Sequence, residues 1–285
     1  MATCPLCQTE STPAFSAGEH RMFRCRSCAL VFVDPCPTAD YLSRFYSQFH
    51  RSSQEGGTYD EVEGRARADF PAKLQLVRST LRQPGAKLLD VGCGKGYFVQ
   101  CCNEAGFVTE GIDLSDTAVA WARDRLGVTA RCGSVEDITE GNAPYDAATF
   151  WATVEHVRKP VEMLCAIRRV LKPQGHLFLD TGVAGDLLDR LLPGVVQWYD
   201  PPQHLFVFSK RAIALLLDKA GFDVLSVDMC FDRSTARRVT RTMRGVACAC
   251  VLRAVAELAR INPAGPFPFT RFPLGNLMSV VARAR

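Results

Sequence analysis

Short apolar runs alternate with amphipathic segments along most of the chain beyond residue 86. Strands buried on both faces read as continuous apolar runs, whereas helices repeat their apolar positions every three or four residues. Glycines such as Gly106 and Gly127 follow the helical segments, where a left-handed residue often ends a helix. The apolar runs predict seven strands, at residues 87–91, 108–112, 128–132, 146–150, 176–180, 222–227 and 276–282. The helical pattern predicts helices over residues 96–105, 115–126, 160–171 and 209–220.

Strands that alternate with helices imply crossover connections between parallel strands. We therefore expect an α/β fold, with a Rossmann-like, seven-stranded, mostly parallel sheet and helices on both faces. The pattern divides the chain into a small N-terminal unit at 1–36, a helical cap at 37–80 and the main domain at 81–285. Residues 232–265 form a helical insertion before the last strand and carry seven arginines against two acids.

The N-terminal unit carries two Cys-x-x-Cys pairs, Cys4 with Cys7 and Cys25 with Cys28, separated by 17 residues. Each pair can hold one edge of a tetrahedral zinc ion, and this spacing is typical of four-cysteine zinc sites. A redox pair is the alternative, but it needs only one such motif on a strand-to-helix turn. We predict a small zinc ribbon, here called the zinc knuckle, whose Zn²⁺ is structural because four thiolates leave no open position.

The strongest chemical signal follows the first predicted strand, where Asp90 precedes Gly92, Gly94 and Gly96. Glycines at this spacing let the backbone turn and approach a ligand at the carboxyl ends of the strands. A dinucleotide site would instead require Gly-x-Gly-x-x-Gly, and an acid at position 90 would repel a negatively charged pyrophosphate. An acid suits the positive amino and sulfonium groups of S-adenosylmethionine (SAM). Asp113 ends the second strand and is suited to bind ribose hydroxyls, although it could merely cap the next helix.

Four segments in order carry a family resemblance, which covers about residues 80–230 and the final strand. They are Leu-Leu-Asp-Val-Gly-Cys-Gly-Lys-Gly at 88–96, Val-Glu-His-Val-Arg-Lys-Pro at 154–160, Leu-Lys-Pro-Gln-Gly-His at 171–176 and Ala-Gly-Phe at 220–222. The first motif alone is moderately specific, whereas four in this order are highly specific. The chain resembles class I SAM-dependent methyltransferases, and within them the ubiquinone-type O-methyltransferases and related small-molecule enzymes.

The resemblance implies further cofactor contacts and one departure. Trp151 stands where this group places an apolar residue against the cofactor. The family often has an aspartate near the adenine where this chain has Ser134, so backbone atoms of Ser134 and Val135 are expected to serve. The cofactor-binding residues that we expect are Asp90, Gly92, Gly94, Gly96, Asp113, Ser134, Val135 and Trp151.

Methyl transfer to oxygen or nitrogen also requires removal of a proton. The candidate bases are His156, which follows the fourth predicted strand, and His204, which lies in the aromatic and proline-rich segment 198–204. We expect both to reach the mouth of the cofactor cleft. Some ubiquinone-type relatives bind magnesium through Glu-x-x-Glu-His, and here Ala152 replaces the first acid. Glu155 and His156 alone make a poor magnesium site, so we predict activity without Mg²⁺.

The composition limits the classes of partner and the cellular location that we expect. The 285 residues are 47% hydrophobic, which is enough for a full core, and the net charge of +4 does not favour a nucleic-acid partner. No signal peptide or apolar run long enough to span a membrane is recognised, so we expect a cytoplasmic protein. The arginine-rich insertion is expected to form a packed helix, and attachment to a membrane surface is the less favoured interpretation.

These observations favour a SAM-dependent methyltransferase that acts on a small-molecule acceptor, at oxygen. Three alternatives stay open: carbon methylation of a nucleotide-linked sugar, modification of RNA bound by the zinc knuckle, and a binding module whose SAM site has decayed. Asp90, Gly92, Gly94 and Asp113 are all intact, which argues against decay.

Overall fold

The main body of the computed structural model is one seven-stranded sheet, in the order β11-β12-β9-β8-β5-β6-β7. The structure describes residues 2–42, 44–45, 67, 69–138, 145–185, 198–230 and 277–285. The strands are β5 (Lys87–Val91), β6 (Val108–Asp113), β7 (Ala130–Cys132), β8 (Tyr145–Trp151), β9 (Leu171–Gly182), β11 (Phe222–Cys230) and β12 (Leu277–Ala284). Only β12 runs antiparallel to its neighbours, so the expected seven-stranded, mostly parallel sheet is confirmed.

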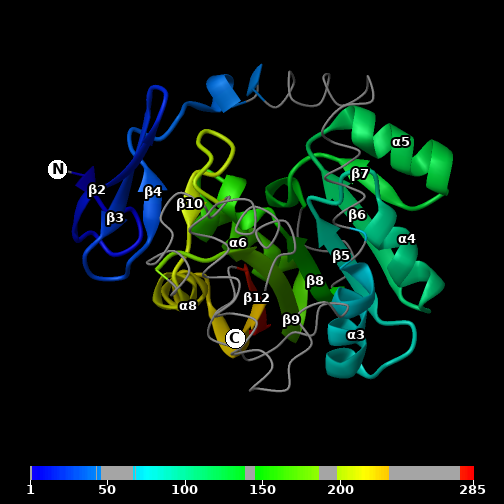
Figure 1. Cartoon of the computed structure of the whole chain (residues 1–285). Helices are drawn as coiled ribbons and strands as arrows, with labels where there is room; N and C mark the ends of the chain where they lie inside the picture. Colours follow the sequence, from blue (N-terminus) through cyan, green and yellow to red (C-terminus); the bar gives the residue numbers. More distant parts are fainter. Residues whose placement is uncertain are drawn as a thin grey trace, which may run out of the picture.

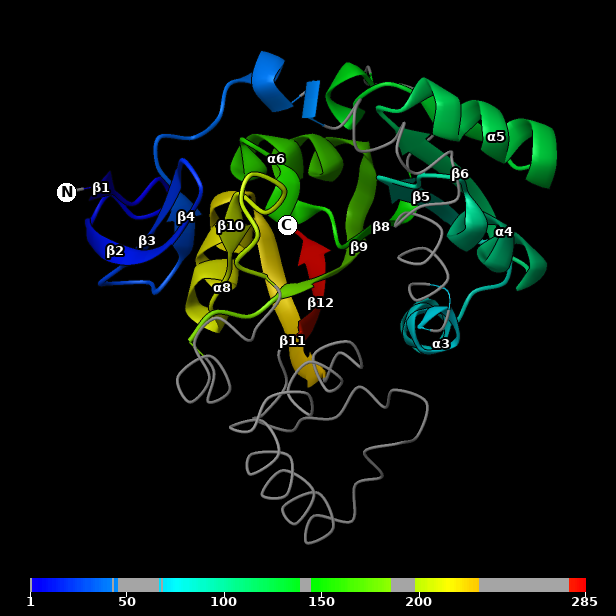
Figure 2. The ribbon, with the colours of Figure 1, turned by 45° about the horizontal axis from the view of Figure 1, so that its top comes forward.

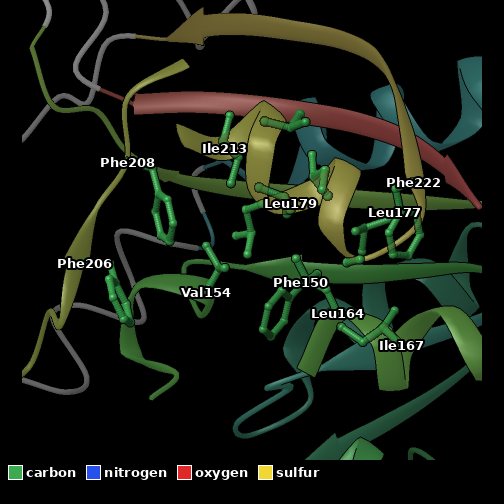
Figure 3. Close-up of a cluster of buried hydrophobic side chains, with 14 of the residues drawn as sticks. Phe150, Val154, Leu164, Ile167, Leu177, Leu179, Phe206, Phe208, Ile213 and Phe222 are labelled. Carbon is green, nitrogen blue, oxygen red and sulfur yellow. The ribbon is translucent and has the colours of Figure 1, made fainter. Parts of the chain in front are cut away.

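Helices cover both faces of this sheet (Figures 1 and 2). They are α3 (Phe70–Leu81), α4 (Tyr97–Glu104), α5 (Asp116–Leu126), α6 (Pro160–Val170) and α8 (Lys210–Lys219). Successive strand residues point to opposite faces. Leu88 therefore packs in a cluster with α3 and α4, while Leu89 belongs to the cluster of α6 and α8. Figure 3 shows the second cluster, in which Phe150 and Leu179 of the sheet face Leu164 and Ile213 of the helices.

Two strands, β9 and β7, begin two or more residues away from the predicted position. Strand β9 begins at Leu171 rather than at residue 176, because Leu171 already pairs with Tyr145, the first residue of β8. The register then shifts, and pairing resumes at His176 beyond a turn that contains Gln174 in the left-handed region, at φ 62°. Strand β7 begins at Ala130, two residues later than predicted, and pairs only with the last three residues of β6.

The N-terminal unit forms a second, five-stranded sheet in the order β1-β2-β3-β4-β10. Its strands are β1 (Ala2–Thr3), β2 (Glu10–Ala17), β3 (His20–Cys25), β4 (Val31–Val33) and β10 (Phe206–Val207). The last strand comes from the segment that follows β9, about 170 residues further along the chain. Sequence analysis did not foresee that this segment completes the sheet of the zinc knuckle.

Two sequence predictions fall partly or wholly outside the described residues. The arginine-rich insertion at 232–265 lies outside them, as does most of the predicted cap at 37–80. The described part of that cap includes α3, whose Val77 packs with Phe98 of α4 beside the sheet. The division into domains at residues 36 and 80 stays a prediction. No helix in the described part of the chain is long and apolar enough to span a membrane.

Candidate cofactor and acceptor site

The glycine-rich turn lies between β5 and α4, at the carboxyl end of the sheet. Gly92, Gly94 and Gly96 all have positive φ angles, of 77°, 51° and 74°, which a side chain would strain. A Cβ on Gly92 would lie 2.7 Å from Thr153 Oγ1, so this glycine lets the segment after β8 approach the turn. A Cβ on Gly96 would lie 2.9 Å from Ala122 Cβ, so Gly96 is also needed for α4 to pack against α5.

Asp113 connects the end of β6 to the glycine-rich turn. Its carboxylate accepts hydrogen bonds from the backbone N–H groups of Gly94 and Ser115, both at 2.8 Å. Ser115 caps α5 with its own side chain, which accepts from Ala118 N, so Asp113 is not the helix cap. A carboxylate offers about four acceptor positions, and two stay available for ribose hydroxyls. The geometry is compatible with the ribose role, which stays a prediction.

Asp90 is a buried acid at the end of β5, with only 3% of its surface exposed. Its Oδ1 accepts a hydrogen bond from Thr149 Oγ1 at 2.6 Å, across the β5–β8 pair. Burial raises the pKa of Asp90 to about 7, because the charged form loses its hydration. A buried carboxyl with so high a pKa gains stability when a cation binds beside it.

Trp151 ends β8 and lies beside a buried ion pair. Its ring meets Phe98 edge-on, with centroids 5.7 Å apart, and the ammonium of Lys73 lies 4.8 Å from the ring centroid. Lys73 Nζ is 2.8 Å from Asp180 Oδ2, and Asp180 Oδ1 accepts from the backbone N–H of Ala152 at 2.6 Å. Trp151 Nε1 is buried without a hydrogen-bond partner among the described residues, which is costly unless a ligand satisfies it.

Ser134 and Val135 follow β7, where the adenine is expected. The Ser134 hydroxyl accepts from Glu136 N, and the Ser134 N–H donates to Asp137, in a capping box that begins the short helix η1 (Val135–Asp137). Val135 is 1% exposed and belongs to the core. Ser134 therefore acts as the cap of η1. The expected backbone contact with adenine stays a prediction, and the Ser134 N–H is already engaged.

The two candidate bases lie together, although 47 residues separate them in the sequence. The rings of His156 and His204 have centroids 4.9 Å apart. Nδ1 of His156 donates to the carbonyl of Gln203 at 2.6 Å, and Nδ1 of His204 donates to the carbonyl of Trp198 at 3.1 Å. A carbonyl can only accept, so in the neutral rings the lone pair lies on Nε2.

Glu155 lies beside the two histidines and directly precedes His156 in the short helix η2 (Val154–His156). Thr181 donates to Glu155 Oε2 at 3.0 Å, while the buried Oε1 has no partner among the described residues. One potential ligand atom from each of Glu155, His156 and His204 lies within 4.8 Å of the others. One carboxylate and two imidazoles suit zinc or iron better than magnesium, which prefers oxygen ligands.

Burial changes the proton affinity of all three groups. It raises the pKa of Glu155 to about 8, and it lowers the pKa of His156 below its usual value. The pKa of His204 falls to about 3, chiefly through burial and additionally through the neighbouring His156. This is well below the value of about 6.5 for an unperturbed histidine. The carbonyls of Gln203 and Ala152 oppose the shift at His156, because they stabilise its protonated ring.

The four knuckle cysteines meet at one point. The Sγ atoms of Cys4 and Cys28 are 3.7 Å apart, and Cys7 Sγ lies 3.4 Å from Cys25 Sγ and 3.6 Å from Cys28 Sγ. Zn–S bonds of about 2.3 Å in a tetrahedron place sulfurs about 3.8 Å apart. The cluster thus fits one zinc ion and does not resemble a single redox pair.

Sequence reasoning missed the buried polar groups that surround these residues. Lys73, Asp180 and Thr149 are 7%, 3% and 0% exposed. Asp180 could have been noticed, because it stands near the end of a predicted strand, as Asp90 does. Lys73 gave no such signal, since a lysine in a helix is usually solvated.

Comparisons with known proteins agree with one another. The methyltransferase domain family model matches residues 62–227. A ubiquinone biosynthesis O-methyltransferase of Xanthomonas campestris is 32% identical over 202 residues, covering 63% of this chain and 82% of that protein. The enzyme of the same description from Xanthomonas oryzae is 33% identical over 171 residues, covering 53% of this chain and 72% of that protein.

Solved structures show the same fold at lower identity. The 1,6-didemethyltoxoflavin-N1-methyltransferase of Burkholderia thailandensis, with S-adenosylhomocysteine bound, is 18% identical with a TM-score of 0.56, covering 95% of this chain and 98% of that one. A SAM-dependent methyltransferase from Thermotoga maritima is 20% identical with a TM-score of 0.55, covering 83% of this chain and 98% of that one.

Proposed function

We propose that this chain, which belongs to the methyltransferase domain family and is a class I SAM-dependent methyltransferase, methylates a small-molecule acceptor at an oxygen atom. The ubiquinone biosynthesis O-methyltransferases it resembles support an oxygen acceptor. One observation supports the proposal. Gly92 of the glycine-rich turn lies against Thr153, three residues before His156, so the histidine pair follows the strand end that borders this turn.

The cofactor side consists of two acids with different tasks. When bound, SAM supplies a positively charged sulfonium that carries the transferable methyl group. Asp113 would accept the ribose hydroxyls with its remaining lone pairs. Asp90 would lie nearest the positive amino and sulfonium end, where the cation would keep its carboxyl ionised. The unpartnered Nε1 of Trp151 and the buried Lys73–Asp180 pair border the same region.

The acceptor side provides proton removal. We assign the base to His156, because it lies three residues after Thr153, which borders Gly92 of the glycine-rich turn. Nε2 of His156 would take the proton of the acceptor hydroxyl, while Nδ1 keeps its bond to Gln203. His204 would position the acceptor. Because its low pKa keeps its own ring neutral, it would add no positive charge beside His156. Glu155, with a pKa of about 8, would stay largely protonated beside them at neutral pH.

The zinc knuckle adds a structural metal to this proposal. Cys4, Cys25 and Cys28 are each at most 2% exposed, and Cys7 completes the set. Four thiolates would fill the coordination sphere of Zn²⁺, so the ion would stabilise the fold and take no part in methyl transfer.

A labelled-cofactor screen tests the function. The chain is incubated with SAM carrying a deuterated methyl group and with phenols, sugars and amines, and products are analysed by mass spectrometry and NMR. We expect label on an oxygen, as a methyl ether, and His156→Ala should form it about 100- to 10,000-fold more slowly. Label on carbon or nitrogen would contradict the assigned acceptor atom, and formation at the wild-type rate in His156→Ala would contradict the assigned base.

A further inference from the structure

The zinc knuckle shares a sheet with the segment that carries His204. Strand β4 pairs with β10, with Phe32 opposite Phe206 and Val31 opposite Val207. The N–H of Val33 extends this ladder by donating to the carbonyl of Leu205 at 2.9 Å. Figures 1 and 2 both show β4 directly beside β10, at the opposite side of the molecule from β6 and β7. The knuckle therefore pairs with the backbone immediately after His204.

Side chains strengthen this connection at both ends of the segment. Arg24 of β3 donates to the hydroxyl of Tyr199 at 2.9 Å, and Phe15 packs against the same tyrosine, with ring centroids 5.7 Å apart. At the other end, the hydroxyl of Ser209, which caps α8, donates to the carbonyl of Cys28 at 2.5 Å. Cys28 belongs to the thiolate cluster, so residues 199–209 are fixed directly to the expected zinc site.

The opposite side of the segment fixes the histidines. Its carbonyls at Gln203 and Trp198 accept from His156 and His204, as described above. The N–H of Leu205 donates to the carbonyl of Glu155 at 2.8 Å. Residues 198–205 thus lie between the knuckle and η2, and they set the orientation of both imidazole rings.

We propose that the zinc knuckle is a positioning element of the acceptor site: zinc binding holds segment 198–208 in place, and that segment orients His156 and His204. The proposal rests on the proposed function, because it takes these histidines as the acceptor-side groups. Arg24 is a positioning residue in this scheme, because it acts on the histidines through Tyr199.

Hydrogen–deuterium exchange, which requires no knowledge of the acceptor, tests the proposal. Exchange is compared between the zinc-loaded wild type and a Cys4→Ser, Cys7→Ser double variant whose zinc loss is verified by elemental analysis. We expect peptides covering 198–208 to exchange at least tenfold faster in the variant, while peptides covering 87–113 stay unchanged and SAM affinity stays within threefold. Cys36→Ser, at an exposed cysteine outside the cluster, is the matched control and should behave like the wild type.

Two outcomes would overturn the proposal. Unchanged exchange at 198–208 after zinc loss would show that the segment does not depend on the knuckle. A uniform rise throughout the chain, with SAM binding lost, would show that zinc supports the whole fold rather than the acceptor side. Failure of methyl transfer alone would affect only the proposed function, since neither exchange nor SAM binding depends on turnover.

A second variant leaves the zinc site intact. Arg24→Ala removes the donor to Tyr199, and we expect faster exchange at 198–204 with one zinc per chain retained. Misplacement of a reacting group by about 1 Å can cost up to about 100-fold in rate, so kcat should fall while the KM for SAM is unchanged. Arg24→Lys can still donate to Tyr199 and should recover part of the rate. Equal kcat values in all three proteins would count against a positioning role.

Discussion

The buried carboxyl of Asp90 makes SAM affinity dependent on pH. Binding of a cation favours the ionised carboxylate, so any Asp90 that is protonated before binding must first lose its proton. Burial holds the pKa of this carboxyl at about 7 instead of the usual 3.8. SAM should therefore bind more tightly as the pH rises towards 7. Asp90→Asn removes the titrating group and keeps an oxygen that can accept from Thr149.

The size of the effect follows from the ionised fraction. With a pKa of about 7, roughly half of Asp90 is ionised at pH 7 and about 3% at pH 5.5, so SAM affinity should differ about 15-fold between these pH values. The SAM amino group, with an ordinary pKa near 7.7–8.0, stays largely protonated over this range. Glu155 titrates above the range and His204 below it, so neither should produce the same slope.

Isothermal titration calorimetry with SAM at pH 5.5, 6, 6.5 and 7 measures this slope directly, with circular dichroism to confirm folding at each pH. Asp90→Asn should bind more weakly at pH 7, by roughly 10- to 150-fold if an interaction of about 1.5–3 kcal/mol with a charged group is lost. Its affinity should hardly change with pH. A flat profile in the wild type, or an equal slope in the variant, would refute the role of Asp90 as the acid beside the cation.

Four further predictions concern the ribose contact, the zinc knuckle, the histidine pair and the need for magnesium. Asp113→Ala should weaken SAM binding by about 1.5–3 kcal/mol at every pH and keep the wild-type slope, and calorimetry showing wild-type affinity would disprove the ribose role. Elemental analysis should find one zinc per chain, absent from the Cys4→Ser, Cys7→Ser variant; unchanged metal content would exclude these ligands. His156→Ala should lower turnover about 100- to 10,000-fold with SAM affinity retained, and His204→Ala should have a smaller effect, so equal turnover in both variants and the wild type would exclude histidine as the base. Turnover should persist after dialysis against zinc-containing, magnesium-free buffer, and activity that returns only when Mg²⁺ is added would contradict this.

Sequence pattern predicted the sheet well because its signals are local. The strands and helices of the described main domain were placed within a few residues, since apolar runs, caps and terminating glycines act over short distances. The exception, β9, begins early because Leu171 finds a pairing partner in β8. That partner is distant in sequence, and no local pattern reveals it.

The spacing of the cysteine pairs predicted that the four thiols meet, and the structure brings them together. The cofactor roles of Asp90 and Asp113 were inferred from residue type and spacing and stay predictions. The pairing of β4 with β10 could not be predicted, because a two-residue strand has too few positions for a pattern. The low pKa of His204 also escaped prediction, since it results from burial among groups brought together by folding.

A crystal structure of the zinc-loaded chain with S-adenosylhomocysteine would test the proposed site most directly. We expect the ribose hydroxyls to lie within hydrogen-bond distance of Asp113, with the amino group beside Asp90. The sulfur should lie at the carboxyl end of β8, on the side of the histidine pair. A ligand whose ribose is bound elsewhere, or whose sulfur faces away from His156 and His204, would contradict the proposed arrangement of cofactor and acceptor.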